Sequence, residues 1–431
     1  MRDRFRSVFS VFDRGHVKFL GSSALVQFLP LFTAPIIARL YTPADFGVYG
    51  VFYALVGIIA SVSSLALTNA IISEKHEAGT VHATLVAMSA VLAVSMLLLV
   101  LVITLPKAAA VLALGPIVPS YLLWLPLTVF VQGVMACLYA WGIRMQLYSL
   151  MARNKLILGL STAVLQISIG LGQFGAIGFI VANLCGVLLA STLLGAPFWR
   201  ALRAVPHGFG LRSGWASVVE ARRLVIWTVP ASLVNSVGTM LPDLMINRYF
   251  GAALYGEYSL ANRMVAFPLA FVSTSLTDIF RQQAAREVAE TGSCRNSFNR
   301  FFLIMGVAAL VILLPVILLM PFVFPVIFGE AWGNAGTLIQ AVVFLLIIRF
   351  ISSPLSYVWI ICGHQRRNFF WQLGLLGLTL AAFVGGQLVY PDISLYDMLW
   401  IYSGLIGAWY VLCIWLSRCF AYAAIPPSQP T

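Results

Sequence analysis

Apolar positions along this chain gather into twelve long segments that short polar stretches separate. Many of the segments are apolar on every face. The length of each segment and the polar residues at its ends therefore identify the spans better than a helical period does. A helix that spans a bilayer needs about 20 predominantly apolar residues. The pattern predicts spans at Val17–Ile37, Phe46–Ile72, Ala83–Leu105, Ile117–Trp141, Leu156–Gly172, Ala176–Phe198, Val225–Asn247, Leu254–Phe280, Phe301–Ile327, Leu338–Ile361, Phe370–Val389 and Tyr396–Leu416.

Composition supports the same conclusion. Of 431 residues, 61% are hydrophobic and 9% are charged, whereas a soluble domain carries about 25% charged residues. This balance excludes a soluble globular enzyme, a disordered protein and a disulfide-rich secreted scaffold. The six cysteines form no CxxC pair and mostly lie in apolar runs, which is typical of small buried side chains. The sequence predicts an all-α polytopic membrane protein of about 12 transmembrane helices in two six-helix lobes.

The basic residues alternate along the chain and so assign a side of the membrane to each loop. Of 26 Lys and Arg, 21 lie in the even-numbered gaps between segments and at the two termini. The exceptions are Arg39, Lys107, Arg248, Arg263 and Arg349. Because Lys and Arg collect in cytoplasmic loops, we expect an even number of spans, with both termini in the cytoplasm. The same bias explains the net charge of +12 without a nucleic-acid partner.

A short pattern, R-x-[YF]-x-x-A-x-[FY]-G-x-Y, occurs twice, first at Arg39 and again 209 residues later at Arg248. Each copy follows the first span of a group of six, which favours a duplication whose halves share one orientation. We therefore expect five regions: a basic interfacial segment at 1–16, an N-lobe at 17–198, a basic cytoplasmic linker at 199–224, a C-lobe at 225–418 and a tail at 419–431. The segment 1–16 fits a helix lying in the membrane interface and equally a frayed basic tail.

Two arginines lie inside apolar segments, where a charge is costly and usually faces a cavity. At a rise of about 1.5 Å per residue, Arg263 lies about 13 Å and Arg349 about 16 Å deep. Each side chain either lines a cavity as an anion-binding cation or pairs with a carboxylate from another helix. We expect a shared anion site, because few compensating acids fall at that depth by counting.

Asp243 and Asn247 end a polar stripe on one face of the seventh segment. Asp243 is the carboxylate of that face, which makes it the candidate for a proton or sodium site. It also lies near the outer end of its span, so a structural role in capping or pairing is an equal alternative. No cofactor other than such a coupling ion is expected.

Motifs for catalysis are missing from the sequence. It contains no HExxH, GxSxG or P-loop, and the exterior loops are too short for a catalytic domain. We therefore expect no enzyme activity.

Four stretches together resemble the polysaccharide-type flippases, the Wzx-like O-antigen and exopolysaccharide transporters of bacteria, which share a superfamily with the MATE multidrug exporters. The stretches are Ala38–Leu55, Ile143–Leu171, Asp243–Phe271 and Phe328–Gln340. The resemblance covers most of the chain. Its order and spacing are specific, although each motif is loose. Lipid II flippases of the superfamily commonly carry two further spans, which this pattern does not show.

The resemblance implies a V-shaped protein that works by alternating access in the bacterial inner membrane. Such proteins move a polyprenyl-diphosphate-linked oligosaccharide from the cytoplasmic to the periplasmic leaflet, and they tend to have a cationic central cavity. Arg263 matches a position that is often basic, and Asp243 matches a recurrent acid. We assign Arg39 and Arg248 to the anion-binding set as well. The expected partners are membrane lipids, a polysaccharide polymerase and chain-length proteins.

Two other function classes remain open. A cation-coupled multidrug exporter of the same superfamily would favour acidic and aromatic cavity residues, whereas the buried charge here is mainly cationic. A non-transporting membrane scaffold that organises a polysaccharide assembly complex is the other open alternative.

Overall fold

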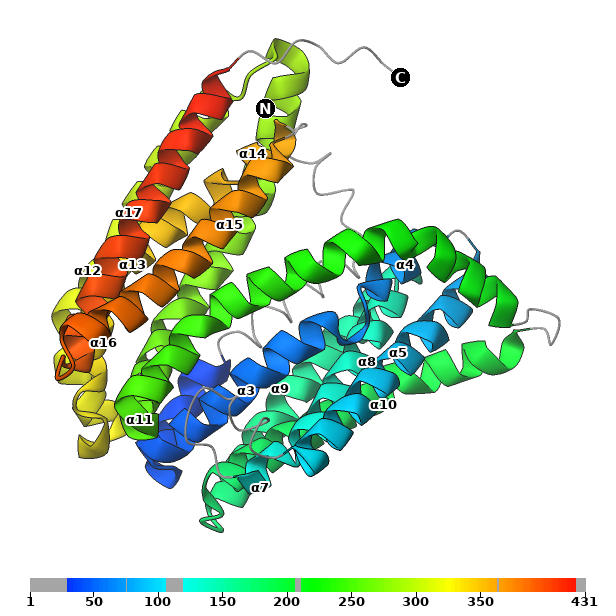
Figure 1. The fold of residues 1–431 in the computed structure, drawn as a ribbon, viewed down its shortest axis with the longest axis horizontal. Coiled ribbons are helices and arrows are strands. Elements are labelled where there is room, and N and C mark those ends of the chain that lie inside the picture. The colour runs from blue at the N-terminus through cyan, green and yellow to red at the C-terminus, as the bar shows by residue number, and fades with distance from the viewer. Residues whose placement is uncertain (1–28, 75, 106–118, 206–210, 363, 424–431) are drawn as a thin grey trace. The chain divides into compact units, whose positions relative to one another are not determined.

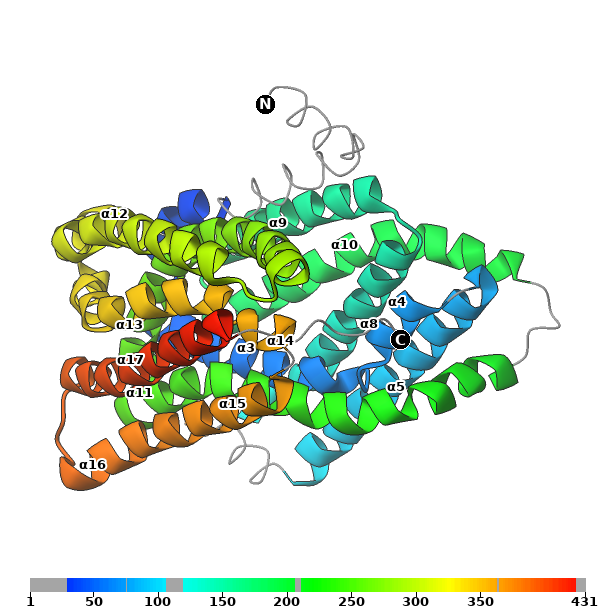
Figure 2. The ribbon, with the colours of Figure 1, turned by 90° about the horizontal axis from the view of Figure 1, so that it is seen from above.

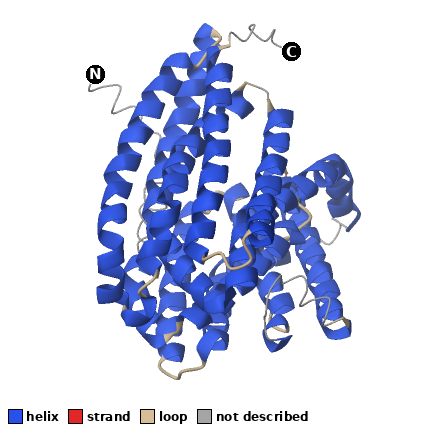
Figure 3. Ribbon diagram, turned by 60° about the vertical axis from the view of Figure 1, so that its left-hand side comes forward, coloured by secondary structure: helices blue, strands red, loops and turns tan. Residues whose placement is uncertain are grey.

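The computed structural model describes residues 29–423 apart from residues 75, 106–118, 206–210 and 363. Within these residues the ordered elements are helices and turns, and no strand occurs (Figure 3). Nine helices of this part are long and apolar enough to cross a membrane. The prediction of an all-α membrane fold is confirmed.

Each apolar segment of the sequence lies on a helix wherever the structure describes it. In the first half, the helix Leu29–Leu40 carries the described end of the first segment. The others are α3 (Pro43–Ser63) with α4 (Leu67–Ser73), α5 (Glu77–Thr104), α7 (Pro119–Leu122) with α8 (Leu125–Arg144), α9 (Tyr148–Gly170) and α10 (Gly175–Ala204).

The second half begins with α11 (Leu211–Thr291), which contains two predicted spans joined across a break at Gly251. The remaining elements are α12 (Arg295–Phe328), the 3-10 turn η1 (Glu330–Trp332), α13 (Ala335–Leu355), α14 (Val358–Ile361), α15 (Gln365–Leu380), the π-helical turn η2 (Ala381–Gly385), α16 (Gly386–Val389) and α17 (Leu395–Tyr422).

The break in α11 falls at the position that is equivalent, in the sequence repeat, to a helix break in the first unit. In the first copy, Thr42 separates the helix Leu29–Leu40 from α3 and caps α3 through a reciprocal pair of hydrogen bonds with Asp45. The equivalent residue 209 positions later is Gly251, whose φ of 83° and ψ of 168° interrupt the helix. Glycine reaches this left-handed region without the penalty of a Cβ atom. Both copies of the repeat therefore carry a helix break at the same place.

The chain divides into two units, Met1–Met240 and Leu241–Thr431. The proposed linker 199–224 is helical where it is described, because α10 continues to Ala204 and α11 starts at Leu211. The proposed segment 1–16 lies outside the described residues, and of the proposed tail 419–431 only residues up to 423 are described.

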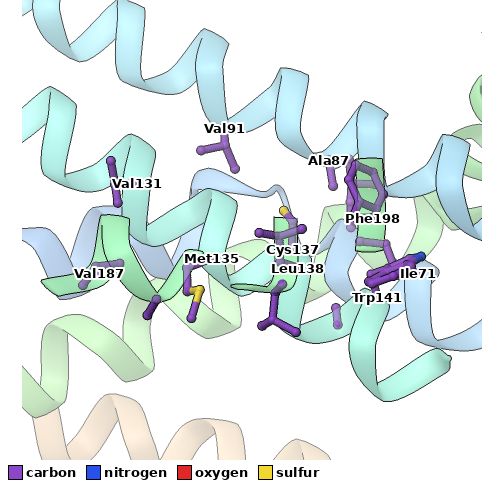
Figure 4. Close-up of a cluster of buried hydrophobic side chains, with 14 of the residues drawn as sticks. Ile71, Ala87, Val91, Val131, Met135, Cys137, Leu138, Trp141, Val187 and Phe198 are labelled. Atoms are coloured by element: carbon purple, nitrogen blue, oxygen red, sulfur yellow. The ribbon is translucent and has the colours of Figure 1, made fainter. Parts of the chain in front are cut away.

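The first unit is built around α8, which packs against α3, α4, α5 and α10. Figure 4 shows the apolar cluster at this junction, where the Trp141 and Phe198 rings meet edge to face at 5.3 Å. The neighbouring side chains Cys137, Leu138 and Val91 are buried. An edge-to-face pair of this kind adds about 0.5–1.5 kcal/mol beyond its burial, so the cluster fixes the packing of the first unit.

The second unit is built around α13, which packs against α12 and α17 (Figures 1 and 2). Two serines of α17 bind neighbouring helices: Ser403 accepts from the backbone N–H of Leu345 on α13, and Ser417 accepts from Trp359 Nε1 on α14 at 2.6 Å. Pro354 lies in the last turn of α13, which ends at Leu355 before the short α14. These contacts hold α13, and with it Arg349, against α17.

Candidate functional site

The structure brings three of the predicted site residues together in the second unit. Asp243 lies on α11 before the break at Gly251, Arg263 lies on α11 after it, and Arg349 lies on α13. Asp243 interacts electrostatically with both arginines. Counting along the spans predicts few acids at the depth of the arginines, and Asp243 is one that acts on both of them. Asp243 lies eight residues before Gly251, and Arg263 lies twelve residues after it.

Tyrosines surround these three charged residues. Tyr255 and Tyr258 of α11 are 1% and 6% exposed, and Tyr402 of α17 is 7% exposed. Tyr258, Tyr402 and the half-buried Tyr410 all interact electrostatically with Arg349. Tyr255 interacts with Asp243 and Arg263. We call these seven residues the charged cluster: Asp243, Tyr255, Tyr258, Arg263, Arg349, Tyr402 and Tyr410.

Arg349 is the most accessible member of the charged cluster. Its side chain is exposed, although the neighbouring residues Ile348 and Phe350 are buried. Within the described part of the chain, its guanidinium makes no hydrogen bond or contact ion pair, and its neighbours act on it only at longer range. A guanidinium presents five N–H donors in a planar fork that matches the oxygens of a phosphate or carboxylate. The donors of Arg349 are therefore open to an anionic ligand.

Asp243 is half-buried and also lacks a direct partner. No hydrogen bond or contact ion pair joins its carboxylate to another residue that the structure describes. Its negative charge reduces the net positive charge of the cluster without occupying the donors of Arg349. The arrangement can therefore exchange an anion or a proton without first breaking a salt bridge to Asp243.

Asn247 lies one helical turn after Asp243 and is 1% exposed. Neither its Nδ2 nor its Oδ1 atom has a hydrogen-bond partner among the described residues. A buried polar group left unpaired costs about 1–3 kcal/mol, so the native protein is expected to supply a partner such as a water molecule or an ion. The structure thus places an unpaired amide beside the candidate coupling carboxylate.

The two arginines of the sequence repeat are not among the residues that interact with Asp243. Arg39 is exposed near the end of the helix Leu29–Leu40 and belongs to the first unit. Arg248 is exposed three residues before Gly251 and is not among the charges that act on Asp243. The structure therefore does not join either residue to Arg263 and Arg349, and their place in an anion-binding set stays a prediction.

Glu257 is a buried acid that the sequence did not single out. It is 6% exposed, and its carboxylate accepts from the Asn334 backbone N–H at 2.9 Å and from Asn334 Nδ2 at 3.3 Å. Asn334 precedes the first residue of α13, where backbone N–H groups have no partner within the helix. Glu257 thus fixes the start of the helix that carries Arg349.

At the equivalent place in the first unit, neutral aromatic and amide side chains pack together. Tyr41, Tyr49 and Phe46 surround the ring of Phe179, with centroids 4.1–4.9 Å apart. Tyr53 donates to Asn183 Oδ1, and Asn183 Nδ2 donates to Tyr49 Oη at 3.2 Å. These side chains bind one another, so the region is a packed neutral network.

The fold matches that of solved membrane transporters. An inward-facing multidrug resistance MATE family transporter of the MOP superfamily superposes with a TM-score of 0.70 at 14% identity, over 91% of this chain and 94% of that one. The lipid II flippase MurJ, in an inward closed conformation, superposes with a TM-score of 0.69 at 12% identity, over 93% of this chain and 87% of that one. The chain is a multi-pass membrane protein with the fold of these transporters.

Residues 36–336 match the family described as polysaccharide biosynthesis protein, and the chain belongs to this family. Curated relatives include the lipopolysaccharide biosynthesis protein WzxC of Escherichia coli, 22% identical over 57% of each chain. The teichuronic acid biosynthesis protein TuaB of Bacillus subtilis is 25% identical over 44% of this chain and 40% of its own length. The succinoglycan biosynthesis transport protein ExoT of Rhizobium meliloti is 28% identical over 56% of this chain and 47% of its own. The matches span about half the length of these relatives. The resemblance to polysaccharide-type flippases is confirmed at the level of the family.

Proposed function

We propose that the protein is a transporter that flips a polyprenyl-diphosphate-linked oligosaccharide from the cytoplasmic to the periplasmic leaflet for cell-surface polysaccharide assembly. The observation that carries this proposal is Arg349, an exposed guanidinium without a direct side-chain partner among the described residues. It sits in a cluster with a second arginine, within a membrane fold that transporters share. The names of the relatives supply the substrate class.

The main barrier to moving this lipid across the membrane is its diphosphate, because a charged headgroup cannot cross hydrocarbon without a polar environment. Arginine remains protonated and binds phosphate oxygens in a bidentate manner, which makes the contact stronger than a neutral hydrogen bond. Arg349 and Arg263 would hold the diphosphate between them while the tyrosines contribute hydroxyl groups. Release requires that a second ligand shift the balance between two conformations.

Asp243 is the proposed site of that second ligand. A proton or sodium ion on its carboxylate would change the net charge beside Arg263 and Arg349. Asn247 lies one helical turn after Asp243, and the oxygen of its unpaired side-chain amide can serve as a second ligand to the ion. In this scheme the coupling ion and the diphosphate act on each other through one electrostatic cluster.

The location follows from the distribution of basic residues. We place the protein in the bacterial inner membrane with both termini in the cytoplasm, because 21 of 26 Lys and Arg lie in loops and termini of one predicted side. A polysaccharide polymerase and chain-length proteins are the proposed partners. Reporter fusions at Thr431 and within Ser213–Glu220 should both give cytoplasmic signals, and a periplasmic signal at either place contradicts this orientation.

Transport by the purified protein tests the proposed function directly. The full chain is reconstituted into vesicles that hold a fluorescent polyprenyl-diphosphate-linked oligosaccharide, and a soluble glycosidase outside reports how much reaches the outer leaflet. A second set of vesicles measures the movement of ethidium, a cationic multidrug substrate. We expect flipping of the glycan lipid and no ethidium transport.

The other outcomes separate the alternatives. Ethidium transport without flipping would make the protein a multidrug exporter. Movement of neither compound, by protein that is monodisperse and correctly folded, would favour a scaffold over a transporter.

A further inference from the structure

Each unit carries one amphipathic cavity that the proposed transport function does not use. The cavity of the first unit has a volume of about 490 Å³ and lies where α4 ends and α8 turns into α9. Its walls include Ile72, Glu74, Ile143, Arg144, Gln146 and Tyr148. The Arg144 guanidinium is held in place by donating to the backbone carbonyl of Glu74.

The cavity of the second unit has a volume of about 390 Å³ and lies between α11 and α14. Its walls include Asp278, Arg281, Gln282, Tyr357, Ile360 and Ile361. The Arg281 guanidinium stacks on the Tyr357 ring at 4.5 Å. Within the described chain, Asp278 makes no hydrogen bond or contact ion pair, although Arg281 lies only one helical turn away.

The two cavities share both chemistry and position in the repeat. Each is lined by two isoleucines, a tyrosine, an arginine, a glutamine, a carboxylate and one small residue, Ser73 or Ala285. Tyr148 and Tyr357 are 209 residues apart, which is the spacing of the sequence repeat. Ile72 and Arg281 are separated by the same interval. The two cavities therefore occupy equivalent places in the repeat. They are lined by the same kinds of side chain, although most of these side chains come from positions that are not 209 residues apart.

The chemistry of the walls suits a small molecule with both charges. On α11, Asp278 and Arg281 are three residues apart, which places them about 4.5 Å apart along the helix axis. A carboxylate binds an ammonium group, and a guanidinium binds a phosphate. A headgroup in which two carbon atoms separate a phosphodiester from a primary ammonium has the right order and spacing of charges.

Exposed apolar side chains beside these charges point to a lipid rather than a free headgroup. Ile72 and Ile143 of the first cavity are 42% and 39% exposed, and Ile360 of the second is 48% exposed. Both cavities lie at even-numbered gaps of the chain, where the basic residues gather. Acyl chains would contact the isoleucines while the headgroup reaches the charged wall.

We propose that each unit binds one phospholipid of the phosphatidylethanolamine type, with the ammonium on Asp278 or Glu74 and the phosphate on Arg281 or Arg144. The two sites act on membrane lipid and not on the transported glycan. Each site anchors one end of its own unit at a membrane surface.

Native mass spectrometry of the delipidated full-length protein tests the proposal. Dioleoyl phosphatidylethanolamine, dioleoyl phosphatidylglycerol and the chain-free glycerophosphoethanolamine are titrated separately. The wild type should retain two molecules of the ethanolamine lipid and bind it at least about tenfold more tightly than the glycerol lipid, because the contact with a charged carboxylate is worth about 1.5–3 kcal/mol. Glycerophosphoethanolamine should bind far more weakly, since it lacks the apolar contacts.

The variants locate the sites. Asp278→Asn and Arg281→Gln should each reduce the retained ethanolamine lipid from two molecules to one, and Asp278→Asn with Glu74→Gln should remove both. Glu290→Gln and Arg286→Gln are matched controls, because they make the same charge changes in an exposed ion pair of the same helix. Two retained lipids in Asp278→Asn and Arg281→Gln overturn the proposal, as does an equal loss in the controls. Equal binding of glycerophosphoethanolamine overturns the assignment to a lipid.

Discussion

The two copies of the sequence repeat differ in charge far more than in backbone. Both break the helix at equivalent positions, at Thr42 in the first unit and at Gly251 in the second. The residues that match Asp243 and Arg263 at the 209-residue spacing are Ala34 and Ala54, which are 6% and 2% exposed. On α8, the counterpart of α13, no charged residue precedes Arg144.

This difference indicates that the two copies of the repeat have different roles, one in stability and the other in binding. A neutral network such as that of Tyr49, Tyr53 and Asn183 satisfies its own hydrogen bonds and stabilises the first unit. Asp243 and Arg349 make no hydrogen bond or contact ion pair with the described residues, so these two charges stabilise the fold little, because their desolvation cost is not repaid. Retaining such a cluster at one copy of the repeat indicates a function in binding, and the predictions below test this contrast.

Among the single substitutions, the largest effect is expected from Asp243→Asn. The amide keeps the shape and hydrogen-bonding capacity of the side chain but removes the titratable charge beside Arg263 and Arg349. Coupling free energies of 1–3 kcal/mol correspond to about 5- to 150-fold effects, and we expect the response of flipping to an imposed proton or sodium gradient to fall by that factor. The assay is vesicle flipping with and without each gradient. A variant that responds to pH and sodium as the wild type does would leave Asp243 with a structural role only.

A smaller effect is expected from the tyrosine pair at equivalent positions, Tyr49 and Tyr258. Tyr258→Phe removes a hydroxyl beside Asp243 and Arg349, so flipping should slow roughly tenfold with an unchanged melting temperature. Tyr49→Phe removes the acceptor of Asn183 Nδ2, so it should lower the free energy of unfolding by about 1 kcal/mol and leave substrate affinity unchanged. Flipping rates, thermal melting and substrate titration of both variants test whether Tyr258 affects transport and Tyr49 affects stability. The contrast between the units fails if the two variants behave alike.

The smallest effect on transport is expected from Glu257→Gln. The amide still accepts one hydrogen bond from Asn334, but it loses the charge at the N-terminus of α13. We expect the free energy of unfolding to fall by about 1 kcal/mol, with substrate affinity within about twofold of the wild type. Chemical denaturation in detergent measures the change. Glu330→Gln serves as the control, because Glu330 is an acid near the same helix end that does not bind Asn334.

The helices could be predicted from the sequence because each apolar run is long enough to span a bilayer. The repeat marked the region after the first span of each half, and the structure adds that both copies break the helix there, at Thr42 and at Gly251. The site is harder to predict. Counting residues from the ends of each apolar run places Asp243 near the outer end of its span and Arg263 well inside the next span, so the count does not bring the two side chains together. The break at Gly251 falls between them, and in the structure Asp243 interacts electrostatically with Arg263.

The remaining members of the site depend on packing between distant elements. Tyr402 and Tyr410 reach Arg349 because α17 lies against α13, and no local pattern in the sequence marks that contact. Tyr255 and Tyr258 resemble ordinary core aromatic residues in sequence. Glu257 has no local signal either, because the helix that it caps begins 77 residues later.

The most direct test of the account is the flipping rate of Arg263→Ala/Arg349→Ala in reconstituted vesicles. Two charge-assisted contacts with phosphate contribute about 1.5–3 kcal/mol each, so we expect a loss of at least about a hundredfold, with Arg349→Lys between the double variant and the wild type. Arg153→Ala/Arg300→Ala, which removes two exposed arginines outside the charged cluster, should flip at nearly the wild-type rate. Flipping by Arg263→Ala/Arg349→Ala at the wild-type rate, at equal protein level, would contradict a diphosphate site in the second unit.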